Sequence, residues 1–194
     1  TQHGSQVGLM HEEMRYSARK IKRALHFYLG AWMSNPLWLT GLIVIAIGAS
    51  LCRILSWDFM LNSWAENGVP VSDARALDMW ALNILDGLGF RDIGGFWLYE
   101  AFRMPFFSVV LAALYALFGH FYFPVRVVLT ILSVATCLSV AGIGRLLFNQ
   151  KVGFLAGLLY AVYCPMIYYA IAYMTETLFT FLFVLQGIFV LMQW

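Results

Sequence analysis

The sequence predicts an all-α integral membrane protein with about four transmembrane helices, plus juxtamembrane amphipathic helices in the first outer loop. The chain is 62% hydrophobic and 11% charged, about half the charged fraction of a soluble domain. Several apolar runs are long enough to cross a hydrocarbon core of about 30 Å. Most carboxylates fall in one polar interval after the first of these runs. These three observations favour a membrane protein with one large polar loop.

Residues 1–35 form a basic tail, with Arg15, Arg19, Lys22 and Arg23 among its cations. Excess Lys and Arg beside a membrane segment marks the inner side, so we expect a cytoplasmic N-terminus. The spacing of these cations favours an interfacial helix facing anionic membrane lipids, with a solvated tail as the alternative. The net charge of +2 is too small to indicate nucleic acid as a partner.

Residues 36–57 are predicted to form the first transmembrane helix. These 22 residues give about 33 Å of helix, which is enough to cross. Arg53 lies near the far end of this helix and is expected to snorkel to the membrane surface. Residues 58–123 are therefore expected to form an extracytoplasmic loop.

The outer loop carries a predicted amphipathic helix at about residues 73–88. Seven of the ten carboxylates of the chain lie between Asp58 and Arg103. Ser72 is a plausible N-cap, and Asp73 lies favourably in the first turn. Gly87 and Gly89 can end the helix. An apolar stripe follows helical spacing through Leu77, Trp80, Ala81, Ile84, Leu85 and Leu88. Asp78 and Asp86 fall on the other sides and are expected to face water.

Residues 105–119 are apolar but short, at about 22 Å of helix. We favour a second juxtamembrane helix, and a short, deformed membrane span is the rival interpretation. The choice decides the geometry of the two acidic candidates. If this helix does not cross, Asp73 and Glu176 lie on the same side of the membrane. If it crosses, they lie on opposite sides.

Residues 124–194 are predicted to contain transmembrane helices 2–4, over about 125–148, 153–172 and from 175 onward. Pro165 interrupts the middle segment. Arg145 and Lys151 flank the turn before it, which favours a cytoplasmic turn. The small residues Gly153 and Gly157 allow close helix contact, and we expect packing within the chain rather than dimerisation.

Glu176 is the only carboxylate after Glu100. An ionised carboxylate at the mouth of a membrane helix is usually functional or paired, and we favour function. Cys52, Cys137 and Cys164 lack metal-ligand spacing, so neither a disulfide framework nor a zinc site is expected. His120 is expected to contact lipid head groups.

Four motifs in order resemble the polyprenyl-phosphate-dependent membrane glycosyltransferases of the GT-C fold, which include protein O-mannosyltransferases and aminoarabinose transferases. They are Asp73 with the run from Asn83 to Phe90; Arg103-Met104-Pro105 leading into Leu111–Gly119; Gly144-Arg145 to Lys151-Val152-Gly153; and Tyr163-Cys164-Pro165 with Thr175-Glu176-Thr177. The resemblance covers roughly residues 71–191.

The resemblance implies an enzyme that transfers a sugar from a polyprenyl-phosphate donor to an extracytoplasmic acceptor, in the inner membrane of a bacterium. It implies Asp73 as the catalytic base and Glu176 as a second acidic residue. It also implies Arg103 near the donor phosphate, and Arg75 is the other available cation. A carboxylate suits removal of the acceptor proton, and cations or a divalent metal suit the phosphate leaving group. The sequence assigns no metal ligand.

The length of the chain leads to a second hypothesis. Family members have many more spans, so we expect either the N-terminal part of a transferase or a short relative of one. The alternative is a non-catalytic structural subunit of a larger integral-membrane complex, with other membrane chains as partners.

Overall fold

The computed structural model of this chain describes residues 35–63, 73–90 and 105–193, and all regular structure in these ranges is helical. The helical fold class is therefore confirmed. The helices are α2 (Pro36–Ser63), α3 (Asp73–Leu85), α4 (Phe106–Phe118), α5 (Tyr122–Leu147), α6 (Gln150–Val162), α7 (Cys164–Ile171) and α8 (Thr175–Gln193).

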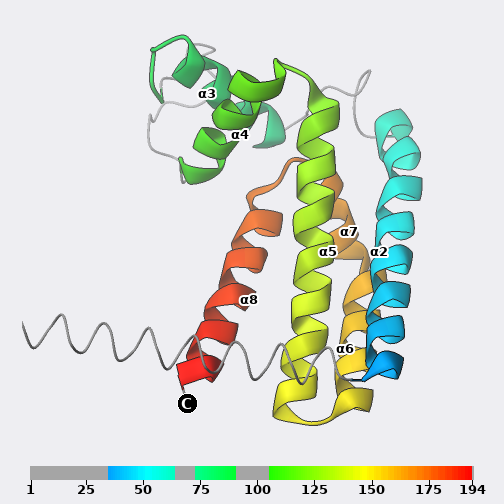
Figure 1. The fold of residues 1–194 in the computed structure, drawn as a ribbon. Coiled ribbons are helices and arrows are strands. Elements are labelled where there is room, and N and C mark those ends of the chain that lie inside the picture. Colours follow the sequence, from blue (N-terminus) through cyan, green and yellow to red (C-terminus); the bar gives the residue numbers. More distant parts are fainter. Residues whose placement is uncertain (1–34, 64–72, 91–104, 194) are drawn as a thin grey trace, which may run out of the picture.

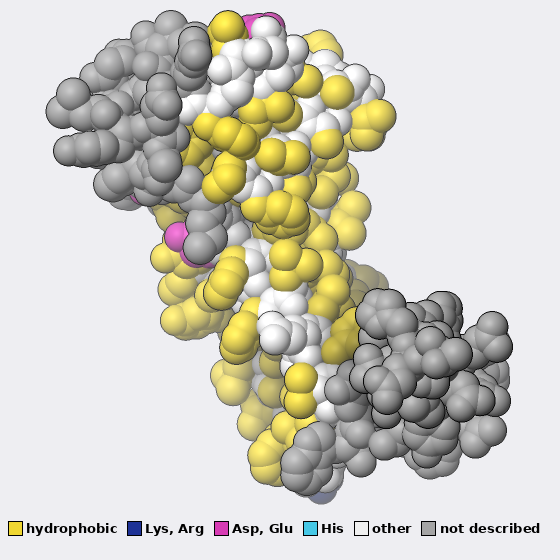
Figure 2. Space-filling view, turned by 90° about the vertical axis from the view of Figure 1, so that its left-hand side faces the viewer, with side chains coloured by type: hydrophobic (Ala, Val, Ile, Leu, Met, Phe, Trp, Pro, Cys, Tyr) yellow, Lys and Arg dark blue, Asp and Glu magenta, His cyan; other side chains and the backbone are white. Residues whose placement is uncertain are grey.

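Helix α5 is the centre of a helical bundle, because it contacts α2, α6, α7 and α8. It runs away from the end where α3 and α4 lie, α6 and α7 return toward that end, and α8 runs away from it again (Figure 1). Hydrophobic side chains cover most of the visible face of the bundle in Figure 2. Such a surface suits a lipid environment rather than water.

Three helical segments are long and apolar enough to cross a membrane: Pro36–Trp57, Tyr122–Leu147 and Thr175–Met192. Helices α6 and α7 together make a fourth if the bent pair counts as one span, with 54° between its halves. The count of three or four agrees with the predicted number. The break falls beside Pro165 in the first turn of α7, as the sequence predicted.

Helix α4 packs mainly against α3, at one end of the bundle (Figure 1). Its 13 residues span about 20 Å. Leu77 of α3, Leu111 of α4 and Val125 near the start of α5 share one hydrophobic core. Tyr173, just before α8, belongs to the same core. The start of α8 therefore lies at the end of the bundle that carries α3 and α4.

The contact between α5 and α6 depends on glycines. A Cβ atom at Gly153 would lie 2.5 Å from the carbonyl oxygen of Ala141, which is much closer than van der Waals contact allows. One at Gly157 would lie 2.8 Å from the Cβ of Ala141. The expectation of close packing within the chain is confirmed.

Arg53 does not snorkel, and the prediction that it would was wrong. Its side chain is 0% exposed, and its Nε donates to Ser133 Oγ at 2.9 Å. Nη1 donates to the carbonyl of Ala161 at 3.3 Å. Pro165 has no N–H to donate to that carbonyl in a continuous helix, so the bend leaves an acceptor that Arg53 takes up. The guanidinium stays inside because distant segments provide acceptors there.

Replacing Gly153 by Ala is expected to destabilise the protein by about 1–3 kcal/mol, since the new methyl group overlaps the backbone of α5. The measurement is the thermal unfolding of the detergent-purified protein. Gly48→Ala is the matched control, because nothing lies within 4 Å of a Cβ at Gly48. If both variants unfold at the same temperature, the close contact at Gly153 is not needed for stability.

Candidate functional site

The predicted acidic residues lie at the start of two helices. Asp73 is the first residue of α3 and Glu176 lies in the first turn of α8, and both side chains are partly buried. Helix N-termini favour negative charge. Thr175 Oγ1 also donates to Glu176 Oε2 at 3.2 Å. Both helices begin at the α3–α4 end of the bundle, so both carboxylates lie at that end.

Of the two predicted cations, only Arg75 lies within the described residues. Arg75 lies two residues after Asp73 in α3 and is exposed. Arg103 lies outside the described residues.

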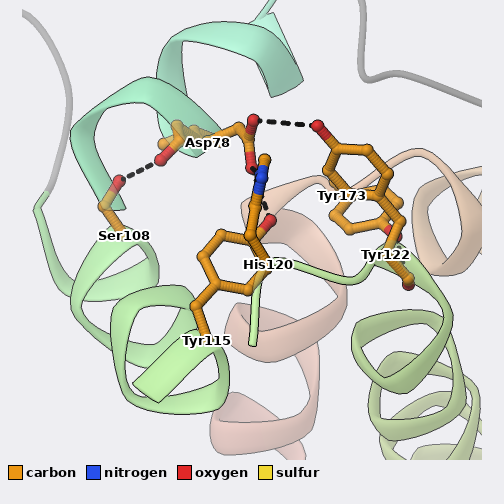
Figure 3. A network of polar contacts seen from close by, with 7 residues as sticks. Asp78, Ser108, Tyr115, His120, Tyr122 and Tyr173 are labelled. Carbon is orange, nitrogen blue, oxygen red and sulfur yellow. Dashed lines mark hydrogen bonds and ion pairs between the residues drawn. The ribbon is translucent and has the colours of Figure 1, made fainter. Parts of the chain in front are cut away.

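Among the described residues at this end, Asp78 has several polar side-chain partners, although the sequence placed it in water. That prediction was wrong, because the side chain is only 6% exposed. Its Oδ1 accepts a hydrogen bond from the Tyr115 hydroxyl and lies 3.3 Å from His120 Nε2. Its Oδ2 accepts from the Tyr122 hydroxyl at 3.3 Å. Figure 3 shows these side chains meeting at the carboxylate.

The turn after α4 brings the partners of Asp78 together. Gly119 ends α4 with a φ of 77°, a left-handed conformation that glycine adopts without strain. The chain then reverses, so that His120 and Tyr122 face the same carboxylate as Tyr115. On the other side of Asp78, Ser108 Oγ donates to the carbonyl of Leu77 at 3.1 Å. Helices α3 and α4 are thus joined by polar contacts as well as by their core.

Tyr173 extends this cluster to the turn between α7 and α8. Its hydroxyl donates to the carbonyl of Tyr122, and the two rings meet edge to face with centroids 5.7 Å apart. The Arg126 guanidinium lies 5.5 Å from the centroid of the Tyr173 ring. Tyr173 has a φ of 57°, which is uncommon for a residue with a large side chain. The hub, defined as Asp78, Tyr115, His120, Tyr122 and Tyr173, thus connects α3, α4, α5 and the start of α8.

The electrostatics of the hub keep its tyrosines protonated. Burial raises the pKa of Tyr115, and the hydrogen bond to Asp78 and the negative charge there raise it further. Burial also raises the pKa of Tyr173, against the opposing effect of the positive charge of Arg126. Protonated hydroxyls can donate, and Asp78 accepts.

His120 lies at the surface of the hub, with 40% of its side chain exposed. The sequence predicted a contact with lipid head groups, and nothing in the structure tests that contact. The contact of His120 Nε2 with the buried carboxylate of Asp78 orients the imidazole ring.

One signal in the sequence could have placed Asp78 inside. Asp78, Ala81 and Leu85 are spaced by three and four residues, so Asp78 borders the apolar stripe of α3. Its partners come from α4 and α5, and a single sequence does not reveal which residues will meet it.

No three His, Cys, Asp or Glu side chains converge as a metal site within the described ranges.

Comparisons with known proteins found no matching protein-family model, no matching curated protein and no matching solved structure.

Replacing Asp78 by Asn is expected to lower the free energy of unfolding by about 1.5–3 kcal/mol, because hydrogen bonds to a charged group are the stronger ones. The measurement is equilibrium unfolding in detergent. Asp86→Asn is the control, since Asp86 is exposed and surface changes stay within about 0.5 kcal/mol. Equal stabilities for the two variants would contradict a structural role of the hub.

Stability is also expected to depend on alkaline pH. A tyrosine with a raised pKa in the folded state contributes fully below its unfolded value of about 10, and this contribution is lost as the pH rises above it. Above that pH, each such tyrosine lowers the free energy of unfolding by up to about 1.4 kcal/mol per pH unit. Between pH 8 and 11, the free energy of unfolding should therefore fall less in Tyr115→Phe than in the wild type. The exposed Tyr163 provides the control, and Tyr163→Phe should keep the full loss.

Proposed function

We propose that this chain is an integral membrane sugar transferase related to the GT-C glycosyltransferases, using a polyprenyl-phosphate donor and an extracytoplasmic acceptor. One observation carries the proposal. Helix α4 packs on α3 at the end where α8 begins, so Asp73 and Glu176 both open helices at that end. This is the arrangement that a shared site needs, and the ordered sequence motifs add support.

Asp73 is the proposed general base. It takes the proton of the acceptor hydroxyl or amine while the acceptor atom forms a bond to the anomeric carbon of the sugar. The bond from that carbon to the phosphate oxygen breaks, and polyprenyl phosphate leaves. A carboxylate in this role accepts the proton directly from the acceptor atom.

Glu176 is the proposed second acidic residue, and Arg75 and Arg103 are proposed to bind the donor phosphate. Arginine suits this task, because its planar, permanently charged fork matches phosphate oxygens. A divalent metal is a further candidate for stabilising the leaving group. The described residues provide no cluster of three ligands, so no step is assigned to a metal.

The hub has a positioning role in this proposal. It fixes α3 on α4 and α5 through Asp78, which lies five residues after Asp73 in the same helix. Tyr173 fixes the turn from which α8 and Glu176 begin. Small shifts of catalytic groups are costly, so rigid support of this kind favours catalysis.

The proposed orientation puts the N-terminus in the cytoplasm and the α3–α4 end outside, in a bacterial inner membrane. The support is the distribution of charge. Arg145 and Lys151 flank the turn between α5 and α6, at the opposite end from α3 and α4 (Figure 1). Cations on that side agree with the tendency of cytoplasmic loops to be positive.

A structural subunit is the second candidate, and one observation favours it. Only 6% of the apolar segment of α8 is buried within the chain. Its exposed side chains include Phe179, Leu182, Phe183, Phe189 and Val190. Such a surface suits packing against other membrane helices as well as against lipid. A wild-type chain that transfers no sugar and co-purifies in fixed ratio with other membrane proteins would favour this candidate.

Replacing Asp73 by Asn is expected to lower sugar transfer by about 100- to 10,000-fold, the usual contribution of a general base. The assay follows transfer from a radiolabelled polyprenyl-phosphate sugar by the purified protein in liposomes. Asp86→Asn is the matched control, because it removes the same charge from the segment just after α3 and should keep activity.

Circular dichroism and gel filtration check that both variants are folded. If Asp73→Asn transfers sugar as fast as the wild type, Asp73 is not the base.

A further inference from the structure

An open groove lies at the end of the bundle opposite to the hub. It has a volume of about 510 Å³ and lies between the first turns of α2 and α6. Its lining residues are Leu37, Trp38 and Gly41 from α2 and Gln150, Lys151 and Phe154 from α6.

Most of the groove is apolar. Leu37 is 76% exposed and Phe154 is 36% exposed, although both are large hydrophobic side chains. A Cβ atom at Gly41 would lie 3.2 Å from the Phe154 ring, so the missing side chain lets this ring pack close to α2. A surface of this kind matches a hydrocarbon chain.

The rim of the groove is polar and positively charged. Lys151 is exposed in the first turn of α6, and Gln150 beside it accepts a hydrogen bond from Asn35 Nδ2 at 3.0 Å. The Arg145 guanidinium lies 4.8 Å from the centroid of the Trp38 ring. Two cations thus lie within or next to the groove.

Helix dipoles add to this positive potential. Helices α2 and α6 both begin at the groove, and neither has an acidic residue in its first turn. A lysine at a helix N-terminus is unfavourable unless an anion is nearby. Among side chains that the structure describes, the carboxylates belong to α3, to the residue after it and to α8. They lie toward the other end and do not neutralise the groove.

We propose that this groove binds an anionic phospholipid. The phosphate of the head group contacts Lys151 and Gln150, and an acyl chain lies over Leu37, Gly41 and Phe154. The apolar lining favours a lipid over free phosphate, because phosphate alone would leave that surface uncovered. The site lies away from Asp73 and Glu176, so the inference goes beyond the proposed transferase activity and does not depend on it.

The test measures lipid retention by the full chain with native mass spectrometry. The purified protein is titrated with phosphatidylglycerol or phosphatidylcholine that carry the same acyl chains. One phosphatidylglycerol is expected to bind about fivefold more tightly than phosphatidylcholine, given the single cation, Lys151, in the lining of the groove. Lys151→Gln should weaken phosphatidylglycerol binding by about fivefold, and Lys151→Arg should restore it.

Asp86→Asn is the control, since it changes one exposed charge at the opposite end of the bundle and should not change retention. A phospholipid with a photoreactive acyl chain provides a second readout, with labelling expected at Leu37 and Phe154. Equal binding of both lipids, or unchanged phosphatidylglycerol binding by Lys151→Gln, would overturn the proposal. Labelling confined to other segments, or cross-links that show residues 1–34 filling the groove, would overturn it too.

Discussion

The structure of the α3–α4 end depends on the polar contacts to the buried carboxylate of Asp78. A charge removed from water is costly unless hydrogen bonds replace those of the solvent. Asp78 receives such contacts from Tyr115, His120 and Tyr122. These partners belong to α4, to the turn after it and to α5. One side chain therefore fixes the mutual placement of three segments, and through Tyr173 it also reaches the turn before α8.

Much of the fold could be predicted from the sequence, because its signals are local. The apolar runs predicted α2, α5 and α8, Pro165 predicted the bend between α6 and α7, and Gly87 predicted the end of α3. The buried charges could not be predicted in this way. Arg53 and Asp78 were both assigned to polar surroundings, since a charge is normally exposed. Their partners lie 80 residues away at Ser133 and 37 residues away at Tyr115. Only the folded chain brings these groups together.

The candidate site could also be predicted only in part, because contacts between distant residues are not visible in the sequence. The sequence indicated that Asp73 and Glu176 open helices, and the structure places both helix starts at one end. The hub that supports them includes Asp78, which the sequence assigned to water, and His120, which the sequence assigned to lipid head groups. The described carboxylates lie at the α3–α4 end of the bundle, together with Arg75 and Arg126, and Arg145 and Lys151 lie at the opposite end. The two ends of the bundle therefore differ in their polar chemistry.

The enclosed guanidinium of Arg53 has a consequence for biogenesis. Ribosomes add about 5–20 residues per second, and the N-terminal segment leaves first. Ser133 and Ala161, which accept hydrogen bonds from Arg53, follow 80 and 108 residues later. In a bilayer, α2 would therefore wait on the order of 4–16 s before Ser133 is synthesised. Until α5 and α6 have been made, Arg53 therefore lacks two of the acceptors that it contacts in the folded chain.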